Sequence, residues 1–69
     1  MYANVNFSTK TKFRQAVLAG QHITLYSPLQ GYAAVRGVVQ AEGPWPGTVG
    51  ARHWRCRVRV QDMRVVGMV

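Results

Sequence analysis

The side chains that could hold a metal ion or act as a nucleophile are few and poorly placed for either task. The soft ligands are His22, His53 and Cys56. Residues three apart on a strand point to opposite faces, so His53 and Cys56 cannot share one metal ion or form a nucleophile–base pair. The only carboxylates, Glu42 and Asp62, fall in separate predicted loops, which argues against a two-carboxylate mechanism. The sequence therefore predicts no catalytic residues, no metal site and no cofactor.

Arginines form the most distinctive pattern. In one predicted strand Arg55, Arg57 and Arg59 alternate with apolar residues and so share one face. A strand rises roughly 3.4 Å per residue, which places successive arginines about 6.8 Å apart, near two phosphate steps of a duplex. Arg52 and Arg64 are assigned to the same binding surface. The alternative is a solvated face whose charges block edge-to-edge aggregation.

The overall charge also points to an anionic partner. Nine Lys and Arg face two Asp and Glu, giving a net charge of +7, and seven of the nine are Arg. Arginine suits bidentate contact with phosphate or carboxylate. Because Trp54 is expected on the face opposite the arginines, no stacking platform is predicted beside them. The expected partner is nucleic acid, bound largely independently of sequence, or an acidic protein surface.

Two further features have a functional and a structural interpretation. The start of the predicted helix is crowded with cations and hydroxyls, which could bind an anion or could be exposed residues tolerated at small cost. These residues are Lys10, Thr11, Lys12 and Arg14. Trp45 stands between two prolines, so it could anchor a protein interface or could fold back to cap the core.

A chain of 69 residues is expected to form one domain, residues 1–69. Local patterns predict the order β-α-β-β-β-β. The strands are expected over 2–7, 22–26, 32–41, 53–60 and 64–69, with turns at 27–31 and Asp62-Met63 and a loop over 42–50. The helix is expected to begin among Ser8, Thr9 and Thr11 and to end at Gly20. Gly37 could mark a bulge or a close backbone approach.

The consecutive strands predict an α+β fold: a small twisted antiparallel sheet of four to five strands with one short helix packed on one face. A small open β-barrel is the alternative. The residues expected inside are Phe13, Val17, Trp54, Cys56, Val58 and Val60. A tight final turn would place Val60 opposite Val65 and Cys56 opposite Val69.

Several short motifs resemble a group of uncharacterised proteins encoded by phages and plasmids. The matching residues are Lys10-Thr11-Lys12, Ala16-Val17, Ala19-Gly20, Glu42-Gly43-Pro44, His53, Trp54, Val58-Arg59-Val60-Gln61-Asp62 and Val65-Val66. The chain departs from that group at Met63, where glycine is usual, at Cys56, near an aromatic position, and in the extra glycines of the loop. The resemblance implies a mobile-element setting and transfers no site.

The expected location is the cytoplasm, or the cytoplasm of the host if a phage encodes the protein. The lone Cys56 fits a reducing compartment, and the first eight residues lack the features of a secretory signal. No apolar run approaches the roughly 18 residues of a membrane span. The apolar end after Arg64 could pair with a second copy, so a homodimer is expected.

The leading hypothesis is a small basic accessory protein of a mobile element. It would bind nucleic acid, or a complex that handles nucleic acid, through Arg52, Arg55, Arg57, Arg59 and Arg64. The alternative is a host-takeover or anti-defence inhibitor that docks on a host protein complex, with Trp45 as anchor and the arginines against an acidic patch.

Overall fold

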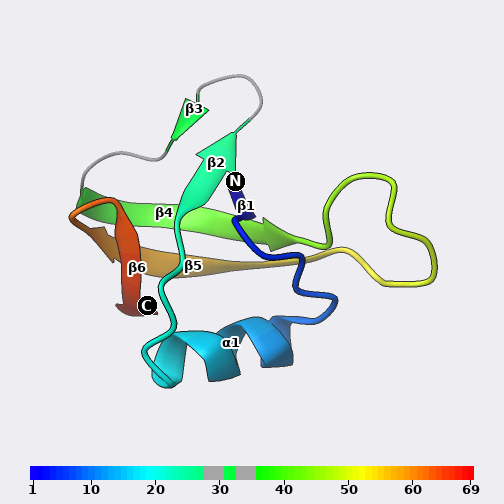
Figure 1. The fold of residues 1–69 in the computed structure, drawn as a ribbon, viewed down its shortest axis with the longest axis horizontal. Helices are drawn as coiled ribbons and strands as arrows, with labels where there is room; N and C mark the ends of the chain where they lie inside the picture. The colour runs from blue at the N-terminus through cyan, green and yellow to red at the C-terminus, as the bar shows by residue number, and fades with distance from the viewer. Residues whose placement is uncertain (28–30, 33–35) are drawn as a thin grey trace.

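The protein, seen in a computed structural model that describes residues 1–27, 31–32 and 36–69, forms one open sheet with a helix on one face (Figure 1). Its elements are β1 (Tyr2–Ala3), α1 (Lys10–Leu18), β2 (Leu25–Ser27), β3 (Gly31–Tyr32), β4 (Arg36–Gly43), β5 (Trp54–Gln61) and β6 (Arg64–Met68). The strand order is β3-β2-β1-β4-β5-β6. β1 pairs with β4 in parallel, and the other neighbours are antiparallel. The α+β fold is confirmed, and the sheet does not close into a barrel.

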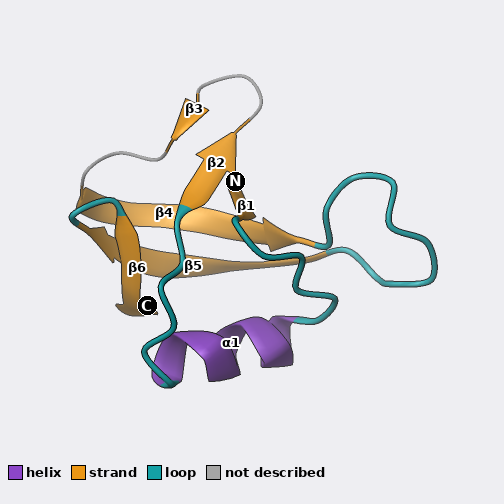
Figure 2. Ribbon diagram, in the orientation of Figure 1, coloured by secondary structure: helices purple, strands orange, loops and turns teal. Residues whose placement is uncertain are grey.

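Helix α1 has well-defined ends and one apolar face. The Thr9 hydroxyl caps its start by accepting a hydrogen bond from the Lys12 N–H at 3.1 Å. At its end Gly20 adopts a φ of 80°, and two backbone bonds close a Schellman motif, as predicted for this glycine. Phe13 and Val17 are buried where α1 packs against β5 and β6 (Figure 2). A helix this short depends on that packing for its stability.

The core lies between α1 and strand β5. Trp54, Val58 and Val60 are buried there, as predicted, while Cys56 is half-buried. The ring of Phe13 lies with its centroid 5.0 Å from that of Trp54 and 5.4 Å from that of Phe7. The Trp54 indole N–H donates to the Phe7 carbonyl at 2.9 Å, so this large side chain is buried without an unsatisfied donor.

The C-terminal hairpin confirms one predicted pair and corrects another. Val60 lies opposite Val65, but a register shift beside it leaves Val66 as an extra residue, so that Val58 faces Met68. The Val69 N–H accordingly donates to the Arg57 carbonyl. The predicted pairing of Cys56 with Val69 is therefore wrong by one residue, because a bulge was not visible in the sequence pattern.

The N-terminal half differs most from the predicted boundaries. The strand predicted over 2–7 ends at Ala3, because the side chain of Asn4 bonds the Thr24 N–H and so replaces a ladder contact. The strand predicted over 22–26 begins only at Leu25. Of the strand predicted over 32–41, residue 32 belongs to β3 and residues 36–41 belong to β4. Gly37 pairs regularly with Val60, without a bulge.

The loop predicted over 42–50 begins after Gly43, since β4 extends to that residue. Residues 28–30 of the predicted turn and 33–35 of the predicted strand lie outside the described residues. Within the described ranges, no helix has the length and apolar character needed to cross a membrane.

Candidate nucleic-acid interface

The face of the sheet turned away from α1, here called the outer face, carries most of the arginines. Directly opposed residues on neighbouring strands share a face. β4 and β5 therefore present four cross-strand pairs there: Arg36–Gln61, Val38–Arg59, Gln40–Arg57 and Glu42–Arg55. Arg36, Arg55, Arg57 and Arg59 are all exposed. The predicted stripe of Arg55, Arg57 and Arg59 thus exists, because Trp54, Val58 and Val60 occupy the inner face.

Arg36 is a member of this surface that sequence reasoning missed. It begins β4, and together with Val38, Arg59 and Gln61 it borders a shallow groove of about 490 Å³. Arg36 is far from Arg59 in the chain, and only the antiparallel register of β4 and β5 brings them together. The sequence predicted a strand that contains Arg36, but it did not reveal that this strand would pair with the one that carries Arg59.

The arginines of the outer face carry no internal counter-charge. In the described part of the chain, Glu42 forms a salt bridge with the amino group of Met1 and a hydrogen bond with His53, each at 3.0 Å. No described arginine forms a salt bridge with Glu42 or Asp62. Four guanidinium groups are therefore available on one surface for an external anion.

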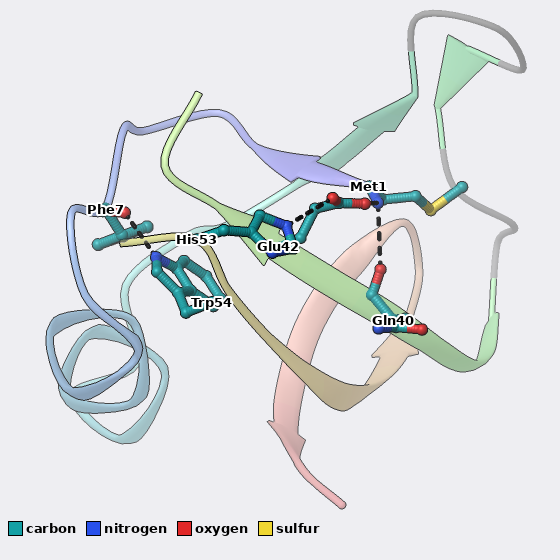
Figure 3. A network of polar contacts seen from close by, with 6 residues as sticks. All are labelled: Met1, Phe7, Gln40, Glu42, His53 and Trp54. Carbon is teal, nitrogen blue, oxygen red and sulfur yellow. Dashed lines mark hydrogen bonds and ion pairs between the residues drawn. The ribbon is translucent and has the colours of Figure 1, made fainter. Parts of the chain in front are cut away.

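Glu42 is held by partners on both sides, as Figure 3 shows. The hydrogen bonds from the Met1 amino group and from His53 lower the pKa of Glu42 below the usual carboxyl value. Burial raises the pKa of Tyr2, and the Glu42 carboxylate beside it raises it further. Glu42, the carboxylate among the four cross-strand pairs, therefore already has a positively charged partner within the protein, the Met1 amino group.

The other two predicted arginines differ from the stripe in their surroundings. Arg52 precedes β5 and borders a groove of about 420 Å³ with Lys10 and Thr9 at the start of α1. The strand register puts Arg64 opposite Gln61 and so on the outer face, as predicted. However, Arg64 is half-buried, and its guanidinium donates to the Gly20 carbonyl at 3.4 Å, at the end of α1. A cation is favourable at that end of a helix. The five predicted arginines therefore do not form one continuous surface.

The four residues of the predicted anion site at the start of α1 do not all border one groove. Lys10, Thr11, Lys12 and Arg14 are all exposed, and no acidic residue balances them in the first helical turn. Of these four, only Lys10 borders the groove with Arg52. The Thr9 hydroxyl is occupied as the helix cap.

The Trp45 ring lies partly exposed on the surface of the protein, outside the buried core. The side chain is 42% exposed. The indole N–H donates to the Ala3 carbonyl at 2.9 Å, and the backbone N–H donates to the Asn6 side chain at 2.8 Å. Both donors of Trp45 are satisfied within the protein, which fixes the ring against β1 and leaves apolar surface facing outward.

The remaining reactive groups are dispersed. Burial raises the pKa of the Cys56 thiol, and the charges of Lys10 and Arg14 offset this in part. A raised pKa disfavours the thiolate, which is the nucleophilic form. Among the described residues, no group of three or more His, Cys, Asp or Glu side chains could hold a metal ion.

No protein-family model, no curated protein and no solved structure matches this chain. Function is therefore inferred from the geometry and charge of the outer face.

Proposed function

We propose that the protein binds nucleic acid through the outer face, largely independently of sequence. The observation that supports this most is the set of exposed, unneutralised arginines: Arg36, Arg55, Arg57 and Arg59. Such a surface releases counterions from a polyanion, and that release supplies most of the affinity in non-specific binding. A net charge of +7 on 69 residues adds long-range attraction.

The arrangement suits a backbone rather than a base sequence. Arg55, Arg57 and Arg59 follow one strand at intervals of about 6.8 Å, so their guanidinium groups meet phosphates in succession. Arg36 adds a cation on the neighbouring strand, near Arg59. Phosphate contacts position a protein on nucleic acid without carrying sequence information.

The test is a titration of a labelled duplex of arbitrary sequence at several salt concentrations, read by fluorescence anisotropy. The wild-type affinity should fall with salt at a slope of about −0.9 per phosphate neutralised. Arg55→Gln, Arg57→Gln and Arg59→Gln should each reduce that slope by about one unit and weaken all sequences alike. These exposed side chains contribute little packing, so the variants should melt like the wild type.

Arg14→Gln is the matched control, because it removes the same charge from α1 and leaves the outer face intact. It should change the slope less than any of the three strand substitutions. If the wild type shows no binding to duplex or single strand up to about 10⁻⁴ M at low salt, the weak end of non-specific affinity, the proposal is rejected.

A second candidate function is the inhibitor that docks on a host protein complex, in the mobile-element setting implied by the resemblance. The fixed, half-exposed ring of Trp45 favours it, because rigid aromatic side chains often dominate protein interfaces. A pull-down from nuclease-treated host lysate separates the two functions. A stoichiometric protein that survives nuclease treatment, together with no affinity for purified nucleic acid, supports the inhibitor.

A further inference from the structure

Beside the arginines, the outer face contains an aromatic groove. It has a volume of about 390 Å³ and lies between β1, β2 and the loop that follows β4. Its lining residues are Tyr2, Ala3, Asn4, Thr24, Tyr26, Trp45 and Pro46. Three aromatic rings therefore meet at one hollow, although they come from three separate segments of the chain.

The strand register places this groove on the same face as the arginines. Tyr26 lies opposite Tyr2, Tyr2 lies beside Glu42, and Glu42 lies opposite Arg55. Opposed residues on adjacent strands point to the same side, so these four form one row across the sheet. Neighbouring strands are about 4.8 Å apart, which puts Tyr2 about 10 Å from Arg55.

The rings are held in place before any ligand arrives. Trp45 is fixed by the hydrogen bond of its indole N–H to Ala3, and Tyr2 lies beside the Glu42 carboxylate. Tyr26 is 44% exposed and Trp45 is 42% exposed, so aromatic surface remains accessible on both. A pre-positioned ring loses little freedom when a second flat group stacks on it.

The single carboxylate within the row does not repel an anion strongly. Glu42 is paired with the Met1 amino group and with His53, as described above. Moving from Tyr26 toward Arg59, the outer face thus changes from aromatic to cationic without an unpaired negative charge between them.

We infer that the outer face binds single-stranded nucleic acid, with bases stacked in the aromatic groove and phosphates on Arg55, Arg57 and Arg59; this rests on the proposed function. Proteins that bind single strands combine a cationic track with aromatic stacking platforms, and every base offers a π-face. The bases of a duplex are stacked on one another and cannot enter such a groove. The aromatic groove therefore favours the single strand, whereas the arginines attract both forms.

The experiment compares three fluorescein-labelled probes of one mixed sequence: single-stranded DNA and RNA of about 12 nucleotides, within the range of sites on small domains, and the blunt DNA duplex. Both single strands should bind more tightly than the duplex. Trp45→Ala and Tyr26→Ala should each weaken single-strand binding by at least about fivefold, the lower bound for one stacked base. Duplex affinity should change by less than about twofold, because phosphate contacts remain.

Three controls make the result specific. Tyr26→Phe keeps the ring in the groove and should retain most of the single-strand affinity, even where an alanine loosens the fold. Trp45→Phe keeps a ring but loses the bond to Ala3, so its affinity should lie between those of the wild type and Trp45→Ala. Leu18→Ala removes a comparable apolar side chain that is 74% exposed on α1 and should change nothing. Arg57→Gln should weaken single strand and duplex together. The DNA and RNA arms show whether the 2′-hydroxyl contributes.

Equal affinity for single strand and duplex, or an alanine effect of the same size on both, overturns the inference and leaves the proposed function standing. Loss of affinity in the phenylalanine variants equal to that in the alanine variants also overturns it. Absence of binding to all three probes rejects the inference and the proposed function together.

Discussion

Glu42 connects the N-terminal segment to the centre of the sheet. Its carboxylate accepts hydrogen bonds from the Met1 amino group at 3.0 Å and contacts His53 at 3.0 Å. The same amino group also donates to the Gln40 carbonyl, which ties β1 to β4 (Figure 3). Because β1 is only two residues long, these polar contacts contribute much of what fixes it between β2 and β4.

Glu42→Gln should therefore lower the free energy of unfolding by about 1 kcal/mol near neutral pH, since the charge-assisted contacts weaken but stay partly solvated. The folded-state pKa of Glu42 lies below 4.5, so its stabilising effect is present above that pH and is lost as the pH falls through the lower value. Urea titrations of both proteins should show a constant difference above about pH 5 that shrinks in more acidic buffer.

The same substitution separates stability from binding. It raises the net charge and leaves the arginines in place, so affinity for a polyanion should increase slightly at low salt. A difference between the two proteins that stays unchanged down to strongly acidic pH would contradict the role given to the Glu42 carboxylate.

At the level of elements, the end of β4 and the start of β5 bring together two motifs that are separate in the sequence, the Glu-Gly-Pro segment and the His-Trp pair. Glu42 contacts His53, and Gly43 lies opposite Trp54. A Cβ atom at Gly43 would come within 2.5 Å of the Trp54 ring, so only glycine allows the indole to lie flat against β4. The Glu-Gly-Pro segment and the His-Trp pair are thus two halves of one packing arrangement.

The β5–β6 hairpin contains a strained turn. Asp62 and Met63 have φ values of 51° and 64°, the left-handed region that a two-residue hairpin turn of type I′ requires at both central positions. A left-handed conformation costs a residue other than glycine about 1–2 kcal/mol. Met63 is 43% exposed, so its side chain offsets little of this cost through packing.

Met63→Gly should stabilise the protein by about 0.5–1 kcal/mol, because relief of the strained φ exceeds the extra chain entropy that glycine adds to the unfolded state. In a domain this small, thermal unfolding should shift upward by several degrees. Met63→Ala is the control: it removes the side chain and keeps the Cβ atom, so it should give no gain. A lower melting temperature for the glycine variant would show that Met63 contributes packing that outweighs its strain.

At the scale of the whole molecule, β6 is an edge strand that is covered only in part. The Val65 N–H donates to the Ile23 carbonyl at 2.8 Å, and the Arg64 guanidinium reaches Gly20, so the segment before β2 crosses the first half of this edge. From the bulge onward the strand is less covered: Val66, the bulged residue, is 47% exposed, and Val69 is 56% exposed. The homodimer expected from the sequence would form through this second half.

Light scattering at high micromolar concentration should then give the mass of a dimer. Val66→Lys should convert it to a monomer, because a lysine on an exposed edge prevents strand pairing. Since the outer face is not part of that edge, the monomeric variant should keep its affinity for nucleic acid. A wild-type protein that remains monomeric at that concentration would reject the homodimer.

The sequence by itself determined the features that depend on neighbours along the chain. Alternation over residues 53–60 assigned the inner and outer faces of β5, because side chains on a strand reverse direction at every residue. Ser8, Thr9 and Thr11 were the candidate caps for the start of α1, of which Thr9 is the cap, and Gly20 marked its end through local capping geometry. The excess of arginine defined the charge, and thereby the class of partner that is now proposed.

Only the tertiary structure decided which strands became neighbours. The parallel placement of β1 beside β4 brings Tyr2 to Glu42, and the pairing of β4 with β5 brings Arg36 toward Arg59. The fold also leaves Arg52 outside the stripe and engages the guanidinium of Arg64 with Gly20, and the bulge at Val66 shifts the last register. These contacts join residues distant in sequence. Strand pairing and register therefore depend on the packing of the sheet and helix as a whole, and the residue pattern of a single strand does not determine them. The aromatic groove beside the arginines exists for that reason, and no segment of the sequence contains it alone.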